Sequence, residues 1–148
     1  MDRNHRRHDA SLLTARVSAG TNAFGKEFLA KMRDEPGVVE LPSGLMYRVL
    51  REGDGEEHPL ADTSCECHYE GRTAANFPSG PVFDSSYARG TPTTIAPNQV
   101  IKGWTEAMQL MVEGDKWEMV IPGALAYGKR GRPPKIPKNA VLVFVMEI

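Results

Sequence analysis

Residues 99–111 read QVIKGWTEAMQLM, and their apolar side chains predict a short amphipathic helix. Apolar residues recur there at spacings of three and four, which places them on one helical face: Val100, Ile101, Trp104, Ala107, Met108 and Met111. Gly114 and Asp115 supply a turn directly after this segment. Such a helix buries its apolar face against a neighbouring layer, so the flanking sequence is expected to supply that layer.

The flanking segments alternate apolar and polar residues, which is typical of half-buried β-strands. This pattern occurs in residues 45–50, 64–69, 116–121 and 141–148. Residues 72–82, rich in proline and glycine, are predicted to form a long hairpin loop. We therefore expect an α+β fold in which the helix covers one face of an antiparallel sheet.

A second helical pattern precedes the strands, with apolar residues mostly four positions apart within residues 10–33. Good capping residues predict that this helix begins near Thr21 or Asn22. It is expected to end at Asp34 and to pack on the sheet or stand free. The chain is accordingly divided into residues 1–37, a polar tail plus helix, and residues 38–148, the main domain.

The composition of the 148 residues, 41% apolar and 25% charged, is that of a globular domain and excludes disorder over the whole length. No apolar run is long enough to span a membrane. No apolar stretch follows the polar N-terminus, so a cytoplasmic location is expected unless a signal peptide has been removed. Eighteen basic and nineteen acidic residues give a formal charge of −1, which does not favour nucleic-acid binding.

The sequence offers little covalent or metal chemistry. Cys65 and Cys67 are expected to be buried free thiols, because no second Cys or His cluster completes a metal site. The histidines are expected to be solvated rather than catalytic: His5, His8, His58 and His68. Nucleophile elbows, phosphate-binding loops and dinucleotide fingerprints are absent from the sequence. No metal and no cofactor are therefore predicted.

Aromatic residues are spread over the predicted strands, helix and loops: Tyr69, Phe83, Trp104, Tyr127 and Phe144. They could converge on one site, but their spacing alone favours ordinary core packing.

Five short blocks, in the same order along the chain, closely resemble the FK506-binding proteins, which are macrolide-binding peptidyl-prolyl cis-trans isomerases. The blocks are HYEG at 68–71, VFDSS at 82–86, QVIKGW at 99–104, LAYG at 125–128 and LVF at 142–144. Together they cover the domain from residue 38 onward. LPSGL at 41–45 and GWTEA at 103–107 resemble the macrophage infectivity potentiator branch of that family.

The resemblance implies a five- or six-stranded antiparallel sheet wrapped around the short helix, with a hydrophobic cavity between them and an N-terminal helical appendage. It also implies roles for the residues that match. Trp104 is the expected cavity floor; the aromatic walls are Tyr69, Phe83 and Phe144; Val100 and Ile101 line the entrance, where the Ile101 amide binds a ligand carbonyl. Asp84 is a polar wall group with Arg89 near it, Tyr127 is a hydroxyl donor, and Ile136 lies on the loop over the mouth.

The activity implied is rotation about X–Pro bonds in peptides and folding proteins. The alternative is a binding module or folding chaperone that holds proline peptides without turnover. Binding of FK506- or rapamycin-type macrolides is also implied, but Arg132 and Lys135 stand where many members carry a histidine and an apolar residue. Weak macrolide affinity is therefore expected.

The loop of residues 129–138 carries five cations among ten residues. It is expected to be a solvated rim that biases substrates toward acidic flanks, and nucleic-acid binding is disfavoured because the net charge is near zero. In the resembled branch a longer helical domain can mediate dimerisation. Only about 35 residues precede the main domain here, so a monomer is expected.

Overall fold

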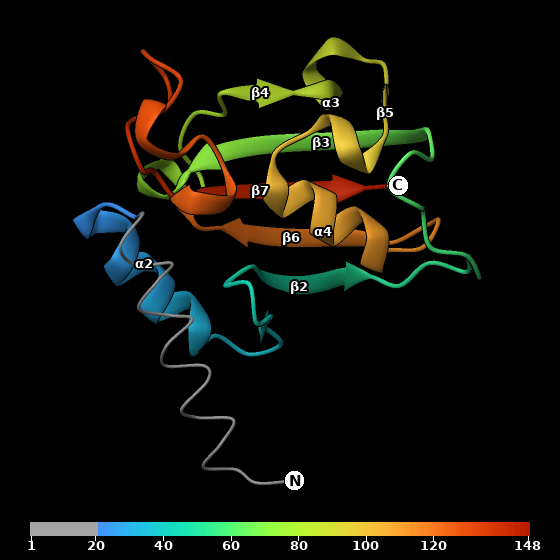
Figure 1. Ribbon diagram of the computed structural model, residues 1–148, viewed down its shortest axis with the longest axis horizontal. Helices are drawn as coiled ribbons and strands as arrows, with labels where there is room; N and C mark the ends of the chain where they lie inside the picture. Colours follow the sequence, from blue (N-terminus) through green and yellow to red (C-terminus); the bar gives the residue numbers. More distant parts are fainter. Residues whose placement is uncertain (1–20) are drawn as a thin grey trace, which may run out of the picture.

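An antiparallel sheet forms the frame of the protein, and its long strands lie where the sequence alternates (Figure 1). The computed structural model describes residues 21–148. Within them the strands are β1 (Val39–Glu40), β2 (Met46–Arg51), β3 (Cys65–Thr73), β4 (Asp84–Ser85), β5 (Thr93–Ile95), β6 (Lys116–Ile121) and β7 (Leu142–Glu147). Hydrogen bonding orders them β1-β2-β6-β7-β3-β4, with β5 paired to β3. The expected α+β fold is confirmed.

The described residues contain seven strands rather than five or six, because β1, β4 and β5 also pair although each has only two or three residues. The predicted hairpin loop lies between β3 and β4. It begins later than expected, since Arg72 and Thr73 still pair with Val143 and Leu142 of β7.

Three α-helices accompany the sheet in the described residues: α2 (Ala23–Arg33), α3 (Ser86–Arg89) and α4 (Lys102–Leu110). The 3₁₀ turns are η1 (Ala74–Asn76), η2 (Pro97–Gln99), η3 (Gly123–Leu125) and η4 (Gly128–Arg130). The helix predicted from residues 99–111 is confirmed as α4. Helix α3 was not predicted, because four residues are too few to reveal a helical period. No helix of residues 21–148 is long and apolar enough to cross a bilayer.

Helix α4 covers the inner face of the sheet (Figure 1). Trp117, Met119 and Ile121 of β6 all belong to the core beneath it. Gly103 permits a close approach, because a Cβ atom at that position would lie 2.6 Å from Cγ2 of Ile121. The helix can therefore pack closely against β6.

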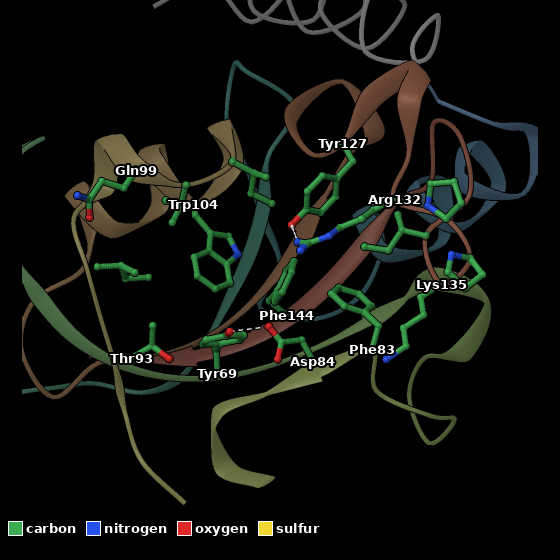
Figure 2. A pocket seen from close by; sticks show the side chains of 16 residues that line it. Tyr69, Phe83, Asp84, Thr93, Gln99, Trp104, Tyr127, Arg132, Lys135 and Phe144 are labelled. Carbon is green, nitrogen blue, oxygen red and sulfur yellow. Dashed lines mark hydrogen bonds between the residues drawn. The ribbon is translucent and has the colours of Figure 1, made fainter. Parts of the chain in front are cut away.

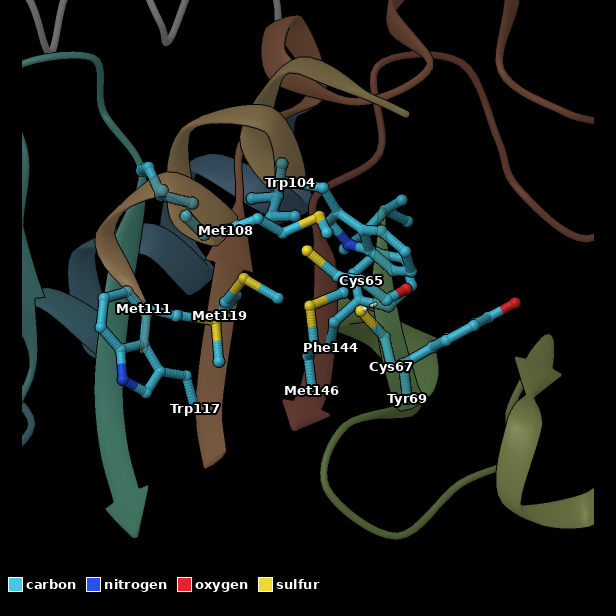
Figure 3. Packing of buried hydrophobic residues seen from close by; sticks show 14 of the residues in the cluster. Cys65, Cys67, Tyr69, Trp104, Met108, Met111, Trp117, Met119, Phe144 and Met146 are labelled. Carbon is cyan, nitrogen blue, oxygen red and sulfur yellow. Dashed lines mark hydrogen bonds between the residues drawn. The ribbon is translucent and has the colours of Figure 1, made fainter. Parts of the chain in front are cut away.

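Sulfur-bearing side chains fill much of this core (Figure 3). They are Cys65, Cys67, Met108, Met111, Met119 and Met146. Both cysteines are free and buried, as predicted. Burial, followed by the neighbouring Cys65, raises the pKa of the Cys67 thiol to about 12, so this thiol stays protonated and unreactive at neutral pH. Among residues 21–148, no three His, Cys, Asp or Glu side chains gather where they could hold a metal ion.

Helix α2 packs on the opposite, outer face of the sheet. It begins after Asn22, as expected, and the Asn22 Oδ1 atom accepts a hydrogen bond of 2.8 Å from the Gly25 N–H. Leu29 of α2 is buried in a second cluster that includes Val120 and Val141. The N-terminal helix therefore packs on the sheet rather than standing free. The part of the helical pattern in residues 10–20 lies outside the described residues.

Candidate active site

A cavity of about 760 Å³ opens between α4, the inner face of the sheet and the loops at one end (Figure 2). Its volume is within the range of small-molecule and peptide side-chain pockets. The cavity is lined by Tyr69, Phe83, Asp84, Thr93, Ile95, Gln99, Val100, Ile101, Trp104, Tyr127, Arg132, Pro133, Pro134, Lys135, Ile136 and Phe144.

Aromatic rings from three elements form the interior of the cavity. The Trp104 ring on α4 has its centroid 4.9 Å from that of Tyr69 on β3 and 4.9 Å from that of Phe144 on β7. Phe83 lies 5.5 Å from Phe144, centroid to centroid, with the planes at 87°. Edge-to-face contacts of this kind are favourable beyond simple burial. The rings therefore hold one another in place before any ligand enters.

Gly71 on β3 makes room for this aromatic wall. A Cβ atom added there would lie 2.5 Å from Cε1 of Phe144 and 2.8 Å from Cζ of Phe83. Both distances are far below ordinary contact, so any side chain at this position would displace a ring. The glycine of the HYEG block is thus a steric requirement of the cavity.

The polar side of the cavity is a network around Asp84. The Tyr69 hydroxyl donates to Oδ2 of Asp84 at 2.6 Å, and Arg89 Nη1 donates to Oδ1 at 2.5 Å. Burial acts to raise the pKa of Asp84, but the hydrogen bonds from Tyr69 and Arg89 outweigh it and hold this pKa below its usual value. Burial, and then the Asp84 carboxylate, raises the pKa of Tyr69. At neutral pH the network is a phenol bound to a carboxylate whose charge Arg89 matches.

Ser86 fixes the backbone that carries Tyr69. Its fully buried Oγ accepts from the Tyr69 N–H at 2.7 Å and donates to the Tyr69 carbonyl at 3.2 Å. His68 Nδ1 lies 2.8 Å from the same oxygen, and the His68 ring stacks on Tyr87. The expectation that His68 is solvated was therefore wrong, because these contacts make it a half-buried structural residue.

Unused polar groups face the cavity mouth. The Ile101 N–H, directly before α4, donates to no acceptor within residues 21–148. The Tyr127 hydroxyl accepts a hydrogen bond from Arg132 Nη1 at 3.3 Å, and no acceptor for its own hydrogen lies in the described part of the chain. Ile136, on the loop over the mouth, is buried at 2% exposure and exchanges backbone hydrogen bonds with Arg132.

Nine of the ten predicted site residues line the cavity: Tyr69, Phe83, Asp84, Val100, Ile101, Trp104, Tyr127, Ile136 and Phe144. The tenth, Arg89, lies outside the lining and acts on it through Asp84 and Tyr69. Further lining residues were not predicted as site residues: Thr93, Ile95, Gln99, Arg132, Pro133, Pro134 and Lys135. Gln99 belongs to the family block at 99–104, and Arg132 and Lys135 belong to the basic loop, so the sequence did draw attention to these three residues. Thr93 and Ile95 lie in β5, which has three residues and is too short to show an alternating pattern.

Comparison with known proteins agrees with this architecture. Residues 55–148 match the model of the FKBP-type peptidyl-prolyl cis-trans isomerase family, and residues 4–49 match the domain amino terminal to such isomerases. The macrophage infectivity potentiator of Trypanosoma cruzi is 44% identical over 140 residues, which are 95% of this chain and 69% of that protein. The crystal structure of FkpA from Escherichia coli superposes with a TM-score of 0.78 at 39% identity, covering 90% of this chain and 60% of that one.

A third relative bears on location. The outer membrane protein MIP of Legionella longbeachae is 40% identical over 126 residues, which are 85% of this chain but only 52% of the relative's length. Its name gives no support to the expected cytoplasmic location. The family expectation, by contrast, is confirmed by both the sequence and the structural matches. The chain belongs to the FKBP-type peptidyl-prolyl cis-trans isomerases and is similar to members of their macrophage infectivity potentiator branch.

Proposed function

We propose that this chain rotates X–Pro bonds by drawing the proline into the aromatic cavity and favouring the twisted amide there. The observation that carries the proposal is the ring of Tyr69, Trp104 and Phe144 around a cavity large enough for a prolyl side chain. Rotation about a peptide bond faces a barrier of about 18–20 kcal/mol, because the planar amide loses resonance. The twisted amide has less charge separation, so an apolar cavity binds it better than it binds the planar form.

The residue roles follow from the contacts around the cavity. The Trp104 ring is the floor on which the proline ring packs, and the free Ile101 N–H binds a substrate carbonyl. Tyr127 donates its hydroxyl hydrogen to the bound peptide. Asp84, held by Tyr69 and Arg89, orients the polar wall rather than transferring a proton, since its charge is already matched. A rate gain of about 10⁵ would require about 7 kcal/mol, shared among desolvation, ring packing and these hydrogen bonds.

The test is the cis-to-trans rate of a short X–Pro peptide series with the wild type and the double variant Tyr127→Phe, Asp84→Ala. We expect measurable turnover that falls in the variant. The matched control is Tyr87→Phe, Asp62→Ala, which makes the same two changes at positions outside the cavity lining. Peptide binding without turnover in the folded wild type would instead support the alternative, a binding module or chaperone.

We propose that FK506- and rapamycin-type macrolides bind this cavity weakly. The aromatic interior supports binding, but the exposed Arg132 and Lys135 at the mouth put charge where a macrolide needs apolar contact. Inhibition of turnover by FK506 measures this. We expect a stronger effect on Arg132→His, Lys135→Ile than on the wild type, and equal inhibition of both would contradict the proposal.

We propose that the protein is a monomer. Support comes from α2, which buries Leu29 and Met32 on its own sheet instead of leaving them for a partner. Sedimentation that shows a stable dimer at micromolar concentration would overturn this.

We propose further that the isomerase acts outside the cytoplasm, because a relative from Legionella longbeachae is named an outer membrane protein. Cell fractionation with an antibody against the protein tests this, and recovery in the cytosol alone would contradict it.

A further inference from the structure

We propose that the cavity prefers proline peptides with a carboxylate side chain next to the X–Pro bond, and that Arg132 and Lys135 are the residues that select them. The proposal rests on the proposed isomerase function of the same cavity. It names the class of substrate that this chain, with its own mouth residues, would process fastest.

The charges around the cavity do not balance. Three of its lining residues have acidic or basic side chains: Asp84, Arg132 and Lys135. Asp84 is matched by Arg89, whose Nη1 lies 2.5 Å from its Oδ1. Arg132 and Lys135 form no ion pair within residues 21–148. Two unmatched positive charges therefore remain at the mouth.

Contacts within the loop position Arg132 at the mouth. The Arg132 N–H and carbonyl both bond to Ile136, at 2.8 and 3.0 Å, and the Ile136 side chain is buried. The Arg132 guanidinium lies 5.7 Å from the centroid of the Tyr127 ring. Lys135 also lines the cavity, and in Figure 2 its side chain points toward the side of the mouth where Phe83 lies. Because both cations line the same cavity as the rings, residues that flank a bound proline come within reach of them.

The selection is local. The whole chain has a formal charge of −1, so it exerts no general attraction on anionic peptides. At about 0.1 M salt the Debye length is about 10 Å, so only charges near the bound peptide act on it. An exposed charge pair is weak, and two such pairs give a preference of roughly three- to tenfold.

The experiment compares peptides that share one X–Pro core and carry Glu, Gln or Lys before or after it. At low salt we expect kcat/KM for the Glu peptide to exceed that for the Lys peptide by about three- to tenfold, and the ratio to approach one near 1 M salt. Lys135→Gln and Arg132→Gln should each lower the ratio. Arg130→Gln and Lys138→Gln are matched controls on the same loop, outside the lining, and should keep it.

Equal rates for the Glu and Lys peptides, or an equal effect of the control variants, would overturn the proposal. Affinities of the same peptides, measured by fluorescence anisotropy, separate this result from failure of the isomerase function. Tighter binding of the Glu peptide without turnover would support the proposed charge selection and would contradict only the proposed isomerase function. Tight, salt-dependent binding of a short single-stranded oligonucleotide that is lost in Lys135→Gln would assign the cations to nucleic acid instead.

Discussion

The two faces of the sheet are filled in different ways. On the inner face, rings from β3, β7 and α4 surround a cavity, whereas on the outer face Leu29 of α2 closes tightly against Val120 and Val141. Neighbouring residues of one strand serve the two faces, because successive side chains point to opposite sides. Met119 and Val120 of β6 are such a pair. A change on the outer face is therefore expected to alter stability without altering the cavity.

The largest effect is expected from the two buried tryptophans of the inner face. Trp104 lines the cavity, whereas Trp117 stacks on Tyr47 at 4.0 Å, centroid to centroid, away from it. Trp104→Leu and Trp117→Leu should both destabilise the fold, by somewhat less than the about 3–5 kcal/mol of a Trp-to-Ala truncation. Only Trp104→Leu should also lower kcat/KM, by about tenfold or more at a temperature where both variants are folded. Equal activity losses would show that the cavity floor has no role of its own.

On the outer face, Leu29→Ala should reduce the free energy of unfolding by about 2–5 kcal/mol, because it leaves a void between α2 and the sheet. Denaturant unfolding measures this loss. The kcat/KM of the folded variant should stay within about twofold of the wild type. A larger loss of activity would mean that α2 acts on the cavity through the sheet.

Gly71→Ala should introduce steric pressure into the aromatic wall. Overpacking of a core typically costs about 1–3 kcal/mol, and the nearest ring atom here belongs to Phe144. We expect a matching loss of stability with a fall in kcat/KM. Combining it with Phe144→Leu should cost less stability than the sum of the two single changes. Strict additivity would contradict the contact.

The smallest effect concerns pH. The folded pKa of Asp84 lies below the unfolded value of about 3.9, so its stabilising contribution is complete above that pH and is lost as the pH falls through the folded pKa. Because its side chain is 42% exposed, solvent screening limits this contribution to roughly 1 kcal/mol or less. Unfolding of Asp84→Asn between pH 7 and 3 should therefore show a shallower acid loss than the wild type. Parallel curves would exclude the linkage.

The long elements and most of the cavity could be predicted because repeated patterns carry them. The apolar residues of α4 recur at spacings of three and four, and in β6 every second residue, Trp117, Met119 and Ile121, belongs to the inner core. Eight of the nine predicted cavity residues stand in the family blocks, each of which assigns its residues to an element of the family fold, and only Ile136 lies outside them.

The remaining features depend on contacts between segments far apart in the chain, to which no local pattern points. Ser86 clamps the Tyr69 backbone seventeen positions away, and this contact is what makes His68 structural. Arg89 reaches Tyr69 from outside the cavity lining because α3, which carries it, lies against β3. The packing of α2 on the sheet likewise needed the three-dimensional structure, since an amphipathic helix suits either a sheet or a partner.

Ile136 is the one buried side chain between Gly131 and Lys138, whose other members are exposed or half-exposed. Because a single apolar residue anchors this loop, its exposed residues can be substituted while Ile136 and the aromatic residues of the cavity are kept. Replacing residues 132–135 by other sequences is therefore a direct way to change which proline peptides the cavity prefers. Natural substitutions in this loop can likewise change the substrate preference while the aromatic interior of the cavity stays the same.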